Sequence, residues 1–433
     1  EDRHACEDAA TDKQPPEVVR KRATCLARAR EQMVAFVDGL GPTPDAKTIQ
    51  GAPGGARDLP APSACNTDVG LADLVVAPDP VTAARMDVLS ARVAKAKALR
   101  HLGKLREART LADGVVVDAR ASGLLPALAE AQHELGTIQH AQKDDRGAEQ
   151  TLEDALAIAA QAHADYRAAE ISAMLVEIVG VRGGVDAAER QARLARSANI
   201  RAGNDRRLDA VIERGLGRAN LEAANFPDAY DHYKRAEAIH TALGLGDDVD
   251  FDLRAQVAAL DNMKRLDEAG RINQRLIASD REHLGPKHPR TLGDTAESAV
   301  ILHRGGHDAE AIAVLEKVMV VDEEVFGRDS SQYTTRRAQL AGMYFAVDRF
   351  EDARAQLAVA VPLMAAHLPP DNKDLRGERK NLAEVSIRLG HYDDAKVQLV
   401  TLLEVAHAAK DDGSIASLSK ELAEVDHWLA KHH

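Results

Sequence analysis

Three cysteines are the most reactive side chains in this 433-residue sequence, and all of them lie within the first 65 residues. They are Cys6, Cys25 and Cys65. No two are spaced as in a Cys-x-x-Cys motif, which argues against a zinc site or a thioredoxin-like centre. The cysteines are therefore either buried thiols or partners in a local disulfide, and a disulfide is typical of an oxidising compartment.

Other chemical motifs have simpler interpretations. His303 and His307 have the spacing of a zinc-binding helix, but two glycines between them predict a turn. Ser-x-x-Lys at 417–420 lacks the partner motifs of penicillin-recognising enzymes, and Gly-Leu-Gly at 215–217 follows no strand. We predict no catalytic residue, no metal and no cofactor.

Arginines give the clearest binding pattern. Arg214 and Arg218 lie one helical turn apart, and Arg254 follows one repeat later. Converging arginines suit an acidic peptide or a C-terminal carboxylate, because guanidinium groups form charge-assisted hydrogen bonds. The alternative is that Glu222 and Asp261 neutralise the cluster within the chain.

A constant period explains how these side chains are positioned. The pattern small-x-apolar-x-x-Ala recurs eight times, and its last alanine, called the anchor, returns every 40 to 42 residues. Repeats of this length are typical of solenoids. The anchors are Ala108, Ala148, Ala188, Ala229, Ala269, Ala311, Ala353 and Ala395.

Each copy predicts one helical hairpin. A small residue stands twelve positions before most anchors, where a second helix approaches closely, as at Gly217 and Ala341. Aromatic residues make up only 3% of the chain, which disfavours a sheet sandwich or barrel. The sequence therefore predicts an all-α fold, a right-handed α-solenoid of eight hairpins.

The array resembles the tetratricopeptide repeat, and this resemblance implies that the first helix of each hairpin lines a concave groove. Residues 18, 15, 11, 8 and 7 positions before the anchors carry eight basic and six acidic side chains, whereas the whole chain has a net charge of −13. This acidic chain argues against nucleic acid as a partner. A protein or peptide ligand is expected, and solvated helix face is the alternative. The predicted groove residues are Lys97, Arg100, His133, His140, Arg214, Arg218, Arg254, Asn262, Arg304, Lys380 and Arg388.

The flanks do not follow the period. Residues 1–87 contain one amphipathic helix over 18–40, with Val19, Leu26, Met33 and Val37 on its apolar face, and then a Gly/Pro-rich run expected to be a flexible loop. The repeat array covers 88–413, and 414–433 form a capping helix and tail. No stretch is apolar enough to span a membrane, and no feature specifies an oligomeric state.

The array resembles the tetratricopeptide repeat. The junction Leu-Gly-Pro-Lys-His-Pro-Arg-Thr at 284–291 is similar to the long repeats of the kinesin light chain type. The resemblance implies a helical scaffold that binds partner peptides in its groove.

The N-terminal order is similar to the region after the membrane helix in serine/threonine kinases of myxobacteria. It reads His-Ala-Cys-Glu at 4–7, Arg-Ala-Thr-Cys-Leu at 22–26 and Pro-Ser-Ala-Cys-Asn at 62–66. The sequence begins without Met, and we interpret it as a mature or cut chain. The resemblance implies the non-catalytic, extracytoplasmic sensor half of such a kinase, because no kinase motif is present. A free-standing cytoplasmic adaptor is the alternative.

For the cysteines we predict a disulfide between Cys25 and Cys65. They bracket 39 residues between the first helix and the repeat array. Cys6 would then be free or paired with a cysteine upstream, and Cys6 with Cys25 is the rival pairing.

Overall fold

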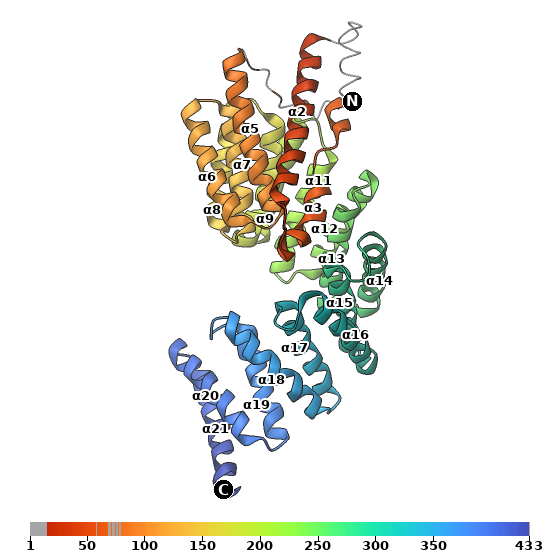
Figure 1. Ribbon diagram of the computed structural model, residues 1–433, viewed down its shortest axis with the longest axis vertical. Coiled ribbons are helices and arrows are strands. Elements are labelled where there is room, and N and C mark those ends of the chain that lie inside the picture. The colour runs from red at the N-terminus through yellow and green to blue at the C-terminus, as the bar shows by residue number, and fades with distance from the viewer. Residues whose placement is uncertain are drawn as a thin grey trace. The chain divides into compact units, whose positions relative to one another are not determined.

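The computed structural model describes residues 15–57, 59–67, 71, 74, 77 and 79–432. Cys6, with the short motif around it, lies outside the described residues. Every regular element in the described part of the chain is a helix (Figure 1), which confirms the all-α fold class. None of these helices is long and apolar enough to cross a membrane.

In the described residues before the repeats, the elements are the long helix α2 (Pro16–Leu40), the helix α3 (Ala46–Arg57) and the 3-10 helix η1 (Pro62–Asn66). The predicted helix is present as α2, but its apolar face is not the one expected. Met33 and Val37 are 51% and 59% exposed, whereas Phe36 is buried. Phe36 packs against Ala98 and Leu102 of the first repeat, so this contact orients α2.

The prediction of a flexible loop in the Gly/Pro-rich run was wrong, because residues 46–57 form the helix α3. The glycines serve close packing. A Cβ on Gly51 would lie 2.5 Å from the carbonyl oxygen of His101, and one on Gly55 would lie 2.5 Å from the ring of Phe36. Tertiary packing against α2 and the first repeat therefore overrides the low helix propensity of glycine.

Eight helical hairpins follow, as the period predicts. The first helix of each is called the A helix here and the second the B helix. In order, the pairs are α5 (Pro80–His101) and α6 (Leu105–Ser122), α7 (Leu125–Ala141) and α8 (Asp145–Gln161), α9 (Asp165–Gly183) and α10 (Val185–Arg201), α11 (Arg206–Glu222) and α12 (Phe226–Leu243), α13 (Gly246–Asn262) and α14 (Leu266–His283), α15 (Pro289–Arg304) and α16 (Asp308–Phe326), α17 (Ser331–Ala346) and α18 (Phe350–His367), α19 (Lys373–Arg388) and α20 (Tyr392–Ala409).

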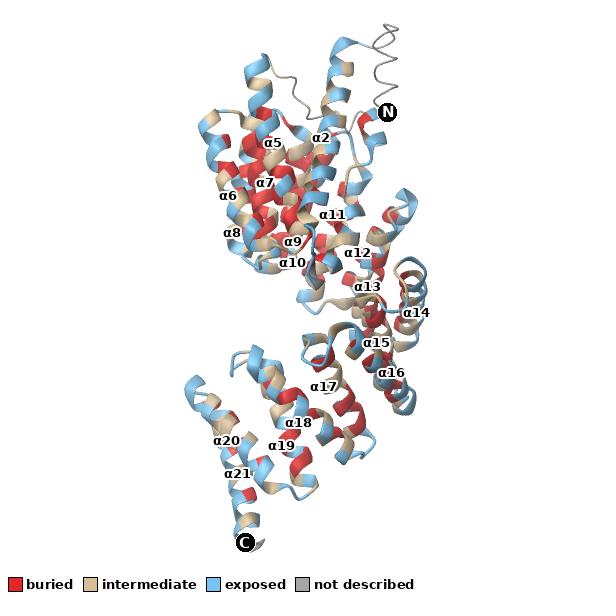
Figure 2. Cartoon of the chain, viewed as in Figure 1, coloured by how far each residue is buried: buried red, intermediate tan, exposed pale blue. Residues whose placement is uncertain are grey.

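The chain divides into two compact units, Glu1–Met263 and Lys264–His433. Their boundary falls in the turn between α13 and α14, inside the array predicted over 88–413. The domain boundaries expected at 87 and 413 stay predictions. Within the first unit, the A helices α7, α9 and α11 bury residues on more than one side, as the red stretches of α7 illustrate (Figure 2).

The anchors and small residues make the helix contacts that the repeat predicts. All eight anchor alanines have no exposed surface. A Cβ on Gly136 would lie 2.5 Å from Leu152, and one on Gly217 would lie 3.0 Å from Tyr233. Leu152 and Tyr233 each stand four residues after an anchor, so the same A-to-B contact recurs in two hairpins.

Each hairpin turns through a residue with a positive φ. In seven hairpins it lies five residues before the anchor, and in the third it is Gly184, four residues before. Three of the seven are glycines, but Lys143, Ala224, Lys264 and Asp348 also adopt this left-handed conformation. An L-residue there is strained by about 1–2 kcal/mol, which the packed hairpin must offset.

The last helix, α21 (Asp412–His432), is the predicted cap. Its Leu418 and Val425 are buried against α20. The chain's single tryptophan, Trp428, stacks on Tyr392 with ring centroids 5.5 Å apart. The cap thus covers the apolar side of the last repeat.

Candidate binding site

The predicted groove residues all lie on A helices. In the first unit, Lys97 and Arg100 lie on α5, His133 and His140 on α7, Arg214 and Arg218 on α11, and Arg254 and Asn262 on α13. In the second unit, Arg304 lies on α15, and Lys380 and Arg388 lie on α19.

The groove face of α5 is covered by the N-terminal helices. Lys97 is half-buried and lines a small hollow with Gln32 and Phe36 of α2 and Gly55 of α3. Arg100 donates through Nε to a carboxylate oxygen of Glu134 on α7, at 2.7 Å. Of the two residues expected to meet a ligand, Lys97 therefore faces α2 and α3, whereas Arg100 is paired with the next hairpin.

His133 lies among cations. Its Nδ1 accepts a hydrogen bond from Arg167 at 3.0 Å. Burial, followed by the nearby charges of Arg167, Arg100 and Lys97, holds the pKa of His133 well below its usual value. A neutral imidazole at this position accepts from Arg167, and protonation would end that bond.

His140 lies among carboxylates instead. Its Nδ1 is 2.7 Å from Asp145, and its Nε2 is 3.6 Å from Glu177. Hydrogen bonding to Glu177 is the largest influence that raises the pKa of His140, with Asp145 adding to it against the opposing effect of burial. The pKa values of two histidines seven residues apart on α7 are therefore shifted in opposite directions.

Arg214 belongs to a buried ionic network. It donates to Asp252 at 2.6 Å and to Asp248 at 2.7 Å, both on α13. Its guanidinium also lies 4.6 Å from the ring centre of Phe251. Asp252 has no exposed surface and bonds at 2.6 Å to His240, which is also buried. Both oxygens of Asp252 are thus engaged, and Arg214 is neutralised within the chain.

The rest of the predicted arginine cluster is also engaged or half-buried. Arg218 pairs with Glu222 at 2.6 Å. Glu222 therefore neutralises an arginine of the cluster within the chain, as the alternative interpretation expected. Arg254 is half-buried on α13, and Asn262 donates to the carbonyl oxygen of Ala258 on its own helix. The cluster is therefore not a convergent set of unpaired charges.

In the second unit the predicted residues do not form one site. Arg304 and Lys380 are exposed. Arg388 pairs with Glu384 at 3.0 Å and lies 5.0 and 5.1 Å from the ring centres of Phe345 and Phe350.

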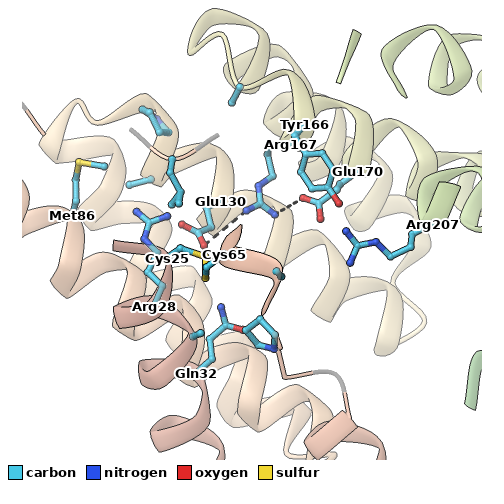
Figure 3. A pocket seen from close by; sticks show the side chains of 17 residues that line it. Cys25, Arg28, Gln32, Cys65, Met86, Glu130, Tyr166, Arg167, Glu170 and Arg207 are labelled. Atoms are coloured by element: carbon cyan, nitrogen blue, oxygen red, sulfur yellow. Dashed lines mark hydrogen bonds and ion pairs between the residues drawn. A yellow bond between two sulfur atoms is a disulfide. The ribbon is translucent and has the colours of Figure 1, made fainter. Parts of the chain in front are cut away.

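A pocket in the first unit was not predicted (Figure 3). It encloses about 270 Å³ beneath a disulfide between Cys25 of α2 and Cys65 of η1, whose Cα atoms are 5.6 Å apart. That separation is within the range that disulfides span. The opposite wall comes from the first turns of α7, α9 and α11, with Met86 of α5 at the side.

Charged side chains of both signs line this pocket. Arg167 donates to Glu170 at 2.7 Å and lies 3.9 Å from Glu130 (Figure 3). Arg207 pairs with Asp205, which caps α11 and does not line the pocket. Two of these pairs are local to α9 and α11, and Arg167 with Glu130 links α9 to α7.

Arg28 on α2 differs from the other cations of the pocket. Its Nε is buried and has no hydrogen-bond partner within the described ranges. Buried polar atoms nearly always have partners, so this nitrogen requires an explanation. No pattern in the sequence pointed to Arg28, because it stands outside the repeat period and lines a pocket with α7 and α9 only in the folded chain.

The weaker motifs are structural. His303 bonds to Asp308 at 2.5 Å, while His307 stands at the cap of α16. Gly215 lies inside α11, where a Cβ would come within 2.8 Å of the backbone nitrogen of Glu177. Among the described residues, no group of three potential ligands is placed to hold a metal ion.

Comparison with known proteins identifies the fold. No protein-family model and no curated protein matches the sequence. A signal transduction ATPase with a tetratricopeptide repeat sensor from Pyrococcus horikoshii has a TM-score of 0.55 at 14% identity, over 91% of this chain and 65% of that one. The apo form of RapI has a TM-score of 0.53 at 10% identity, over 80% of this chain and 99% of RapI.

Tetratricopeptide-like repeats of a putative kinesin light chain from Podosopora anserina have a TM-score of 0.40 at 18% identity, over 48% of this chain and 98% of that one. At these identities a likeness shows the fold alone. The first two comparisons, together with the eight hairpins and their buried anchors, give this chain a tetratricopeptide-like repeat fold.

Proposed function

We propose that this chain is a non-catalytic, partner-binding scaffold or sensor, and that it forms the extracytoplasmic half of a receptor-type bacterial serine/threonine kinase. The observation that carries the binding function is the pocket where α2 and η1 meet three successive A helices. Such a concave, partly charged surface on a rigid repeat scaffold is suited to one segment of a protein partner.

Two observations support the extracytoplasmic placement. The Cys25–Cys65 disulfide is of a kind that persists in oxidising compartments. The order of short motifs around the cysteines is similar to the region after the membrane helix in such kinases. A sensor role also agrees with the Pyrococcus horikoshii protein, in which a tetratricopeptide repeat region is the sensor.

Partner binding is tested by site-specific crosslinking. Gln32 on α2 lines the pocket and is replaced by a photoreactive amino acid. Val117 on α6 is 66% exposed, does not line the pocket and serves as the matched position. We expect the Gln32 variant to crosslink a defined protein from an envelope extract. Equal crosslinking at Val117, or none at Gln32, would contradict the proposal.

The compartment is tested by the state of the thiols. Cells are quenched in acid and treated with a mass-tagging thiol reagent. Cys25 and Cys65 should react only after reduction if the chain is extracytoplasmic. Reaction without reductant would support the alternative, a free-standing cytoplasmic adaptor.

A further inference from the structure

The pocket beneath the disulfide has a geometry that favours a negatively charged group. Pro126, Tyr166 and Arg207 line it, and each is the second residue of its A helix. Three helix N-termini, which carry partial positive charge, therefore lie beside the same open pocket. This arrangement follows from the repeat, because successive A helices begin at the same edge of the unit.

The side chains that line the pocket add to this effect. Arg28, Arg167 and Arg207 face two acidic residues, Glu130 and Glu170, so the lining has one more positive than negative charge. Arg167 is held by Glu170, and Arg207 is held by Asp205 outside the lining. Among the three arginines that line the pocket, Arg28 is the one whose buried Nε has no hydrogen-bond partner in the described ranges.

We propose that this pocket binds one carboxylate side chain of an acidic peptide, and that Arg28 is its principal partner. This inference rests on the proposed partner-binding function and names the chemistry of the partner. A volume of about 270 Å³ admits one side chain rather than a folded surface. A carboxylate would accept from Arg28 in a site partly shielded from water, where a charge-assisted hydrogen bond is strong.

The disulfide controls this site because both of its cysteines line the wall of the pocket. η1 packs on α2, and the Cys25–Cys65 disulfide links the two elements covalently. Loss of the bond would release η1 and open the wall opposite the A helices. Binding of the carboxylate should therefore weaken when the disulfide is removed.

The test uses the full chain and two fluorescent peptides of five residues, one of glutamates and one of glutamines. We expect the glutamate peptide to bind more tightly, and Arg28→Gln to weaken its binding roughly tenfold, as loss of one charge-assisted hydrogen bond predicts. Arg30→Gln is the matched control, because Arg30 is exposed on the same helix and does not line the pocket. The double variant Cys25→Ser/Cys65→Ser should also bind more weakly.

Several outcomes would overturn the inference. Equal binding of the two peptides, or equal losses in the Arg28 and Arg30 variants, would show that no specific carboxylate site exists. If free glutarate competes with the same affinity as the glutamate peptide, the ligand of the pocket is a small organic acid and not a peptide. If Gln32 still crosslinks a partner in any of these cases, the carboxylate assignment fails while the partner-binding function stands. Unchanged thermal unfolding of Arg28→Gln excludes misfolding as the cause of a loss.

Discussion

At the scale of single residues, Asp252 links the predicted groove residue Arg214 to the buried His240. It accepts from Arg214 and bonds to His240 while its own surface is fully buried. A buried charge that loses its partner is strongly destabilising. The residues around Asp252 therefore contribute to stability, and Arg214 is not available for a ligand.

Asp252→Ala should lower the free energy of unfolding by about 3–5 kcal/mol, because it leaves Arg214 and His240 without their shared acceptor. Asp231→Ala is the control, since Asp231 is exposed on α12, and it should change stability by less than about 0.5 kcal/mol. Urea titration measures both. Similar small losses of unfolding free energy in the two variants would mean that the network around Asp252 contributes little to stability.

The two histidines of α7 should give opposite pH effects. The folded pKa of His140 is raised, so its contribution is present below the unfolded pKa, near 6.5, and is lost as pH rises through the folded value. The folded pKa of His133 is lowered, so its contribution is present above about 6.5 and is lost as pH falls.

His140→Gln should therefore cost about 1 kcal/mol more at low pH than at high pH, as expected for a partly exposed ion pair. His133→Gln should reduce the loss of stability that the protein shows on acidification. Urea titrations over a pH series measure both variants. The same pH dependence in both would show that these environments do not control the titration.

At the scale of elements, the hairpins could be predicted because each anchor and its small partner obey one period. The same periodicity placed Arg214 on an A helix but could not show that Asp248 and Asp252 of the next repeat would meet it. It also missed α3. The glycines of α3 predict a loop from the sequence alone, and only packing against α2 and α5 makes this segment helical. Arg28 was missed for the same reason, since only the fold brings it to the A helices.

A matched pair on α17 tests the repeat packing. Ala341 is 1% exposed, whereas Gly342 next to it has open space at its Cβ position. Ala341→Leu should overfill the hairpin and lower stability by about 1–3 kcal/mol. Gly342→Leu should raise stability by up to about 1 kcal/mol, because leucine is the better helix former. Thermal unfolding measures both, and equal melting temperatures would contradict the register.

At the scale of the whole molecule, two compact units each carry their own cores. The disulfide lies entirely in the first unit and joins residues 40 apart. In the chain-entropy account, closing a loop of this size stabilises by about 4 kcal/mol. The second unit contains no cysteine, so reduction gives a way to perturb one unit alone.

Reduction should increase hydrogen exchange in peptides from the first unit and leave those from Lys264–His433 unchanged. Mass spectrometry of the exchanged protein measures both sets of peptides in one experiment. The Cys25→Ser/Cys65→Ser variant is the control and should not respond to reductant. Equal increases in both units would show that they are coupled.

The stacking of Trp428 on Tyr392 has a spectroscopic consequence. The chain has no other tryptophan, and this one lies on the cap of the second unit. Indole emission, excited selectively, therefore comes from the last helix alone. Unfolding of the first unit is silent in that signal, whereas circular dichroism records every helix. A difference between the two curves would separate the melting of the two units without any label or substitution.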